Sequence, residues 1–362
     1  MNTGCETVAV YDEYVDLLKK TVIKGNVTPE YEQELMAPIR KNIDELQPEN
    51  KKLYRYRACE SRNFDALLNN RIYFNTPKNF NDPHDSFFYV DREKFSSILS
   101  ELKPESIIRD ILETRSSTHF SPEKISPNSL LATKVTYDYI KSMNDADFAA
   151  YLERIQKNYS EISKLKSEIS QIIKFTQTNN LKQAREKTYI ACLSEKIDST
   201  LMWAHYADYH KGFAIEYSSE ELSSEAEKCS REHFFALLPV AYSKKQYDAT
   251  EYEKETLWFY INRYYGIDVD FCTPDKLFNI KVNSIKGPDW SYEKEWRLIL
   301  YPCSSNQKTP GCITLKPTAI YLGSNISSSN EQIIRKLIEG KNLHVYRMYV
   351  DEKKDTYALS YK

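Results

Sequence analysis

Two glutamates and an arginine occupy alternate positions in the segment Tyr292–Arg297, as Glu293, Glu295 and Arg297. If the chain is already extended here, alternate side chains point to one face of a strand, and the three groups share that face. Two partly buried carboxylates raise one another's pKa, which is the arrangement that general acid/base chemistry requires. Alternatively, Arg297 neutralises both carboxylates in a salt-bridged strand edge. The segment predicts one of these two arrangements.

A pair of arginines lies in a second segment, Tyr54–Arg57. On a strand, Arg55 and Arg57 project from one face, while Tyr54 and Tyr56 project from the other. Two guanidiniums on one face suit a diphosphate, because each can bind phosphate oxygens through two parallel N–H groups. The chain has 8 glycines and contains neither G-x-G-x-x-G nor a P-loop, so side chains would have to hold a phosphate. A solvated strand face with ordinary ion pairs is the alternative interpretation.

A third segment begins with Ser194 at the end of a predicted strand and continues into a predicted helix, Met202–Tyr206. Trp203, His205 and Tyr206 supply aromatic rings on which a base or a nicotinamide could stack. Ser194 and His205 could form a nucleophile pair, but no G-x-S-x-G turn surrounds the serine. We therefore expect His205 to be a hydrogen-bonded, partly buried histidine.

The turn-rich stretch 75–85 contains three groups that could hold a metal, Asp82, His84 and Asp85. Asn and Asp next to proline commonly accept hydrogen bonds from the backbone of a turn. We expect a rigid loop that forms one wall of the site, with no metal in it.

These segments need a scaffold, and the pattern of apolar residues predicts an α+β protein. Tyrosine-rich strand patterns alternate with short helical patterns over 51–103 and 187–362, which we expect to form the core domain. Residues 1–50 have helical spacing and are expected to form an N-terminal helical appendage. Residues 104–186 are polar and helical, and we expect them to be an insertion into the core.

Within this insertion, apolar residues from Leu152 to Ile172 recur every three or four positions, which predicts one long amphipathic helix. Such a helix would pack on the core. Alternatively, it would pair with a second copy of the chain as a short coiled coil, so that 150–175 would form a homodimer contact.

Composition argues against several classes of protein. Lys and Arg number 50 against 52 for Asp and Glu, and the net charge of -2 provides no overall field for nucleic acid or an anionic membrane. The chain has no apolar run of about eighteen residues, and its acidic N-terminus does not resemble a secretory signal, so we expect a cytoplasmic protein without a membrane span. The 7 cysteines are scattered and include no Cys-x-x-Cys pair, which argues against a disulfide framework or structural zinc.

Four stretches together resemble the bacterial domain-of-unknown-function family 2971: LYRYR, IYFNTPKNFNDPHD, CLSEKIDSTLMWAHYADYHKGFAIEY and YEKEWRLIL. They span residues 53 to 300, and the stretch MWAHYAD-x-HKGFAIEY is highly specific. The family name conveys no activity. The resemblance implies a toxin-like or phage-defence setting.

The same segments show a weaker resemblance to ADP-ribosyltransferases of the arginine-serine-glutamate type, whose site residues occur in this order. That resemblance implies a mixed, split β-sheet core of the ADP-ribosyltransferase-like type with added helices, and NAD as a substrate. Arg55 or Arg57 would hold the NAD diphosphate, and Ser194 would position the later glutamate. Glu295 would grip the nicotinamide ribose and stabilise an oxocarbenium-like transition state, while Glu293 would orient an acceptor of unknown identity.

The sequence departs from this pattern at one place, because Glu195 and Lys196 follow Ser194 where the resemblance leads us to expect a Ser-Thr-Ser run. A histidine-tyrosine variant of the site would use Tyr56 and Tyr206 instead.

Two alternatives from other classes stay open. A metal-dependent nuclease would use Asp82, His84 and Asp85 together with a glutamate of the segment 292–297. A non-catalytic module would recognise a nucleotide or a partner protein through the aromatic helix and the paired arginines, without turnover.

Overall fold

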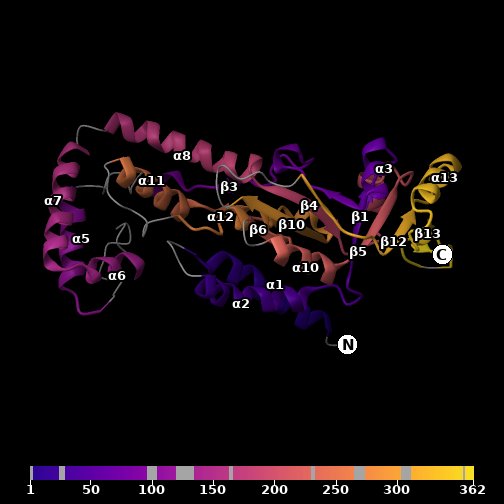
Figure 1. Cartoon of the computed structure of the whole chain (residues 1–362), viewed down its shortest axis with the longest axis horizontal. Helices are drawn as coiled ribbons and strands as arrows, with labels where there is room; N and C mark the ends of the chain where they lie inside the picture. The colour runs from indigo at the N-terminus through magenta and orange to yellow at the C-terminus, as the bar shows by residue number, and fades with distance from the viewer. Residues whose placement is uncertain are drawn as a thin grey trace.

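The computed structural model confirms the α+β fold class. It describes the following residues: 3–23, 29–95, 104–119, 134–162, 166–229, 233–264, 274–302, 311–353 and 355–362. Helices flank a central sheet, and a further group of helices extends away from one end of it (Figure 1).

The central sheet has eight strands in the order β14-β13-β12-β5-β1-β4-β10-β6. Neighbouring strands are antiparallel, except for the parallel pair β12 and β13. In sheet order the strands are Ser360–Tyr361, His344–Tyr349, Ala319–Leu322, Phe213–Ser218, Lys52–Arg57, Tyr189–Ser194, Glu295–Pro302 and His233–Pro239. The three segments singled out in the sequence therefore lie on adjacent strands, β1, β4 and β10.

The pairing between β1 and β4 is short. These strands share one register pair, Tyr54 with Ser194, and further along β4 it is Asn75 that forms a bridge with Ile190. Three small two-stranded sheets accompany the central one. They pair β2 (Arg71–Tyr73) with β11 (Cys312–Thr314), β3 (Phe88–Tyr89) with β8 (Tyr247–Asp248), and β7 (Ala241–Tyr242) with β9 (Ile285–Lys286).

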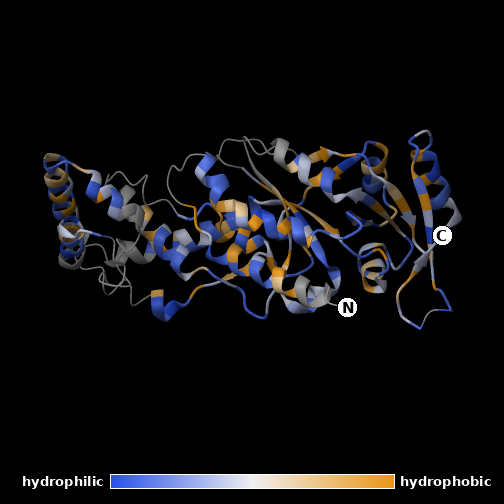
Figure 2. Ribbon diagram, turned by 90° about the horizontal axis from the view of Figure 1, so that it is seen from below, coloured by the Kyte–Doolittle hydropathy of each residue, from blue (hydrophilic) through white to orange (hydrophobic). Residues whose placement is uncertain are grey.

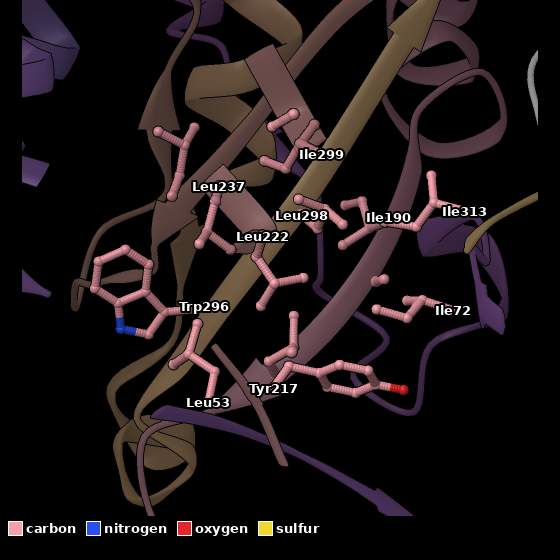
Figure 3. Packing of buried hydrophobic residues seen from close by; sticks show 14 of the residues in the cluster. Leu53, Ile72, Ile190, Tyr217, Leu222, Leu237, Trp296, Leu298, Ile299 and Ile313 are labelled. Atoms are coloured by element: carbon pink, nitrogen blue, oxygen red, sulfur yellow. The ribbon is translucent and has the colours of Figure 1, made fainter. Parts of the chain in front are cut away.

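Two hydrophobic cores pack against the central sheet. The larger is mainly aliphatic and contains Leu53, Leu298 and residues of β5 and β6, packed as in Figure 3. Leu222 of α10 (Ser219–Cys229) packs into this core. The other is aromatic, and its buried residues include Tyr54, Tyr56, Trp203 and Tyr321. At β1 the two cores lie on opposite faces, because successive side chains of a strand point to opposite faces.

The N-terminal residues form two helices, α1 (Thr3–Lys20) and α2 (Pro29–Leu46), which lie beside α10 (Figure 1). They contribute Tyr14 and Ile39 to the aliphatic core, and the Tyr14 hydroxyl donates to the carbonyl of Pro239 at 3.0 Å. Helix formation was expected here, and the packing makes these helices part of the core.

The insertion contains α5, α6, α7 and α8, of which α5 to α7 gather at the end of the molecule away from β1 (Figure 1). Their bounds are Pro104–Ser116, Lys134–Ser142, Asp145–Ile162 and Lys166–Glu186. The single helix expected from Leu152 to Ile172 is wrong, because α7 and α8 are separate helices that run in different directions. Residues 163–165 and most side chains of 158–172 lie outside the described part, so a homodimer through 150–175 stays a prediction.

The remaining helices are short or lie at the edges of the sheet. They are α3 (Ser61–Leu68), η1 (Pro77–Asn79), α9 (Thr200–Tyr206), α11 (Thr250–Tyr264), α12 (Phe278–Asn283), η4 (Pro288–Glu293) and α13 (Ser328–Leu337). Apolar residues gather on the strands and inner helix faces, and the insertion helices are striped with polar and apolar residues (Figure 2). Within the described ranges, no helix combines the length and the apolar character needed to cross a membrane.

Candidate functional site

Five buried charged side chains form a continuous row where β10 begins. Arg297 has no exposed surface and binds both oxygens of Asp85, at 2.9 and 2.6 Å, as well as Glu295, at 3.0 and 3.1 Å. On the other side of Glu295, the Lys286 ammonium donates to Glu295 at 3.3 Å and to Glu293 at 2.6 Å. Acids and bases thus alternate along the row, which allows them to be buried together.

The two glutamates of this row differ in their electrostatics. Burial alone would raise the pKa of Glu295, but Arg297 and Lys286 outweigh it and lower that pKa to about 2. Burial raises the pKa of Glu293, and the neighbouring Glu295 raises it further, against the opposing effect of Lys286. Glu295 is therefore a fixed counter-ion, whereas Glu293 is the carboxylate poised to take up a proton.

The two carboxylates belong to different backbone elements at the start of β10. Glu293 is the last residue of the 3-10 helix η4, and Lys294 follows in the left-handed region at φ 45° before the strand begins at Glu295. The expected extended alternation from Glu293 onward is therefore wrong, because Pro288 begins a helical turn that continues to Glu293. The two carboxylates nevertheless meet, because both accept from Lys286.

Glu293 faces α9 and the loop 75–85. The hydroxyl of Tyr206 donates to its Oε1, and the amide of Asn81 donates to the Tyr206 hydroxyl at 2.9 Å. Tyr206 is half-buried and Asn81 is exposed, so this pair lies between Glu293 and solvent. The loop thus forms a wall beside the carboxylate.

The side chain of Ser194 joins the site through hydrogen bonds to the backbone of other residues. Its hydroxyl donates to the carbonyl of Glu293 at 2.5 Å and accepts from the amide of Lys196 at 3.1 Å. The side chain is fully buried. Ser194 therefore contacts the backbone of Glu293, whereas the resemblance implied that it would position Glu295.

Aromatic side chains surround Glu293 on the solvent side. The Nδ1 of His205 shares a hydrogen bond of 2.8 Å with the hydroxyl of Tyr292, and the His205 ring is exposed. The Lys286 ammonium lies 4.6 Å from the centre of the Trp290 ring. His205 is therefore hydrogen-bonded to Tyr292, but the expectation that it is partly buried is wrong.

Trp203 and Tyr56, expected to contact a cofactor, lie in the aromatic core. Their rings meet edge to face at 5.1 Å, and the indole of Trp203 donates to the carbonyl of Ile197 at 2.7 Å. Tyr56 donates its hydroxyl to the carbonyl of Lys196. Both rings are buried and serve to hold α9 against β1.

Arg55 and Arg57 lie on the other face of the sheet from Ser194 and Glu295. Register places Tyr54 opposite Ser194, and Ser194 opposite Glu295, so this row shares one face and the two arginines project from the other. Arg55 donates to the carbonyl of Tyr73 at 2.5 Å, and Arg57 donates to the carbonyl of Tyr56 at 3.0 Å. The resemblance to ADP-ribosyltransferases implied that Arg55 or Arg57 would act together with Ser194 and Glu295, and the structure does not bring the arginines to that face.

The loop residues considered as metal ligands have other partners. Asp82 accepts from the amide of His84 at 2.8 Å, which is a turn contact, and Asp85 is held by Arg297. Within the described ranges, no group of three side chains has the arrangement of a metal site.

Two residues of the site were not predicted from the sequence. Lys286 lies in β9 and reaches Glu293 because η4 turns the chain back, and no single strand or helix includes both positions. The hydroxyl of Tyr242 in β7 accepts from the backbone amide of Glu295 at 2.8 Å. No local signal marks it, since β7 meets the site through its parallel pairing with β9.

Comparison with known proteins adds one finding. No curated protein and no solved structure matches the chain. The model of the protein family of unknown function DUF2971 matches residues 202–298, a segment that contains Tyr206, Lys286, both glutamates and Arg297. The resemblance to DUF2971 seen in the sequence is thereby confirmed over this segment.

Proposed function

We propose that this chain is a cytoplasmic, NAD-using ADP-ribosyltransferase-like enzyme in which Glu293 is the acting carboxylate. The observation that carries the proposal is the position of Glu293, whose pKa is raised by burial and which lies behind Tyr206 among half-buried and exposed aromatic rings. A toxin or a phage-defence effector is the setting implied by the sequence resemblance.

The chemistry uses the charge of the Glu293 carboxylate. The bond between the ribose C1′ and the nicotinamide nitrogen breaks, and its electron pair leaves with nicotinamide. A carboxylate fixed beside the positive charge that develops on the ribose lowers the barrier to this step. An acceptor nucleophile then attacks C1′ and loses a proton to the Glu293 carboxylate, whose pKa is raised by burial and by Glu295.

Neighbouring groups have supporting roles in this proposal. Ser194 fixes the backbone of Glu293, and Lys286 holds its second oxygen. Displacement of the Tyr206 hydroxyl would give substrate access to the first oxygen. Glu295, which the sequence suggested as the acting residue, is neutralised by Arg297 and Lys286 and is assigned the role of counter-ion.

The test is release of nicotinamide from labelled NAD by the purified chain, with cell extract as the source of acceptors. We expect Glu293→Gln to lower the rate by about a hundredfold or more, because the amide keeps the shape but lacks the negative charge. Glu34→Gln, at an exposed acid of α2, is the matched control and should leave the rate unchanged. Absence of release by the unmodified chain, or an unchanged rate in Glu293→Gln, would count against the proposal.

A non-catalytic nucleotide-binding module is the second candidate. It is favoured by the commitment of Ser194, Trp203 and Glu295 to buried hydrogen bonds and ion pairs within the protein. Saturable binding of NAD by calorimetry, with no product in mass spectrometry after prolonged incubation, would support this candidate over the enzyme.

A further inference from the structure

Both oxygens of the Glu293 carboxylate are engaged in the structure. Its Oε2 accepts from the Lys286 ammonium at 2.6 Å, and its Oε1 accepts from the hydroxyl of Tyr206. The Glu293 side chain is 4% exposed. A carboxylate that takes part in a reaction needs an oxygen within reach of the substrate. The structure therefore shows a closed site, in which one of the two donors has to move before Glu293 can act.

Tyr206 is the donor that can move. Lys286 donates to both Glu293 and Glu295, and its ammonium lies 4.6 Å from the centre of the Trp290 ring. The Lys286 side chain is 4% exposed, whereas Tyr206 is half-buried. Displacing Lys286 would leave two buried carboxylates without a shared cation, which costs far more than displacing a neutral hydroxyl.

The backbone that follows Tyr206 is fixed in place. Residues 208–210 come directly after α9 in the left-handed region, at φ 46°, 52° and 67°. The amide of His210 donates to the carbonyl of Trp203 at 3.1 Å, and the carbonyl of His210 accepts from the amide of Asn325 at 3.0 Å. Left-handed residues other than glycine persist where the surrounding structure holds them. We therefore expect the side chain of Tyr206 to rotate while α9 stays in place.

The loop beside α9 holds Tyr206 in the closed position. The side-chain amide of Asn81 donates to the Tyr206 hydroxyl at 2.9 Å, and this hydroxyl donates to Glu293. Each hydrogen bond in such a chain polarises the next, so Asn81 strengthens the contact between Tyr206 and Glu293. The loop is itself anchored, because Asn75 exchanges two backbone hydrogen bonds with Ile190, at 2.9 and 2.7 Å.

We propose that Tyr206 and Asn81 form a latch that closes the Glu293 site in the absence of substrate, and that Asn81 sets how readily the latch opens. The inference rests on the proposed function of Glu293 and adds the regulation of its site. Asn81 is a positioning residue, because it acts on Glu293 through Tyr206. Substrate has to displace the Tyr206 hydroxyl, so a weaker latch leaves more of the protein competent to bind and raises the apparent affinity.

Access to Glu293 can be measured without NAD. The full chain is treated with a water-soluble carbodiimide and glycine ethyl ester, which couple an amine to the carboxyl groups that they reach. Tandem mass spectrometry of peptides then gives separate labelling rates for Glu293 and Glu295. Asn81→Ala should label Glu293 about fivefold faster than the unmodified chain does, as expected for the loss of one hydrogen bond. The exposed Glu34 of α2 should be labelled at the same rate in both proteins.

Two further variants locate the effect. Asn69→Ala is the matched control, since Asn69 is an exposed asparagine whose side-chain amide donates to Asp65, and it should leave the labelling of Glu293 unchanged. Tyr206→Phe keeps the ring and removes the hydroxyl. It should raise the pKa of Glu293, because the hydrogen bond from Tyr206 favours the charged carboxylate, and carboxyl NMR titration measures this pKa.

An unchanged labelling rate of Glu293 in Asn81→Ala, or an unchanged pKa of Glu293 in Tyr206→Phe, overturns the latch. With NAD as the substrate, Asn81→Ala should raise kcat/KM for nicotinamide release, again by about fivefold. A fall in kcat/KM would overturn the latch, because Asn81 would then assist the reaction. If the unmodified chain releases no nicotinamide, the proposed function fails, and the labelling rates still decide whether the latch exists.

Discussion

Replacement of Arg297 by methionine tests the row of buried charges. Methionine fills a similar volume without the charge, so the variant leaves Asp85 and Glu295 without their shared cation. Glu295 keeps Lys286 at 3.3 Å, whereas Asp85 keeps the neutral hydroxyl of Ser86 at 2.9 Å. Removing one partner of a buried pair costs about 3–5 kcal/mol, and we expect about 4 kcal/mol here.

Urea unfolding at neutral pH, followed by circular dichroism, measures this loss as a difference in the free energy of unfolding. Arg71→Met removes an exposed ion pair with Asp65 and should cost less than about 1 kcal/mol. The double variant of Arg297→Met with Asp85→Asn should recover part of the loss, because it removes the uncompensated charge. A loss below about 1 kcal/mol in Arg297→Met, or no recovery in the double variant, would refute the reasoning.

The same variant should change the dependence of stability on pH. The pKa of Glu295 in the folded state is about 2, below its ordinary value of 4.5. Its contribution to the free energy of unfolding is therefore present above pH 4.5 and is lost as the pH falls toward 2. Each pKa unit corresponds to about 1.4 kcal/mol, which makes this contribution about 3 kcal/mol. Because Arg297 is the largest cause that lowers this pKa, the difference between the unmodified chain and Arg297→Met should shrink over that interval.

Four further predictions concern single residues of the chain. Burial raises the pKa of Glu253 to about 7, so the folded state binds more protons than the unfolded state between pH 4.5 and pH 7. The free energy of unfolding should therefore fall as the pH rises through this interval, by on the order of 3 kcal/mol relative to Glu253→Gln, as measured by unfolding at each pH. Gly212→Ala should abolish soluble expression, because its Cβ would lie 2.1 Å from a backbone oxygen of β1. Gly340→Ala, at a φ of +77° in open space, should cost only about 1 kcal/mol by thermal melting. Lys286→Met should raise the pKa of Glu293 further, because it removes the largest opposing charge, and carboxyl NMR titration would detect the change.

Strand alternation predicted part of the site, and strand register decided the rest. Period-two alternation placed Arg55 and Arg57 on the face opposite Tyr54 and Tyr56, as the structure has them. It could not say which of these faces Ser194 shares. A register shift of one residue would have brought Arg55 beside Ser194, since such a shift exchanges the faces of a strand. Register depends on contacts between distant segments and cannot be predicted from the sequence of either strand alone.

Helical periodicity had a similar limit in the insertion. The apolar spacing continues from Leu152 to Ile172 without a glycine or proline, so the sequence carries no signal for the separation of α7 from α8. The strand β1 and the helix α9 were predicted correctly, because tyrosine-rich alternation and helical spacing are local properties of the sequence.

The row of buried charges has an odd number of members, three acids and two bases. With every group ionised, one surplus negative charge remains in the interior, and Glu293 is the member of the row that lies beside Tyr206 and Asn81. Such a surplus favours positively charged molecules over neutral ones of the same shape. The nicotinamide ring is cationic while joined to ribose and neutral once released. The surplus negative charge would therefore attract the intact dinucleotide and bind the released base less tightly.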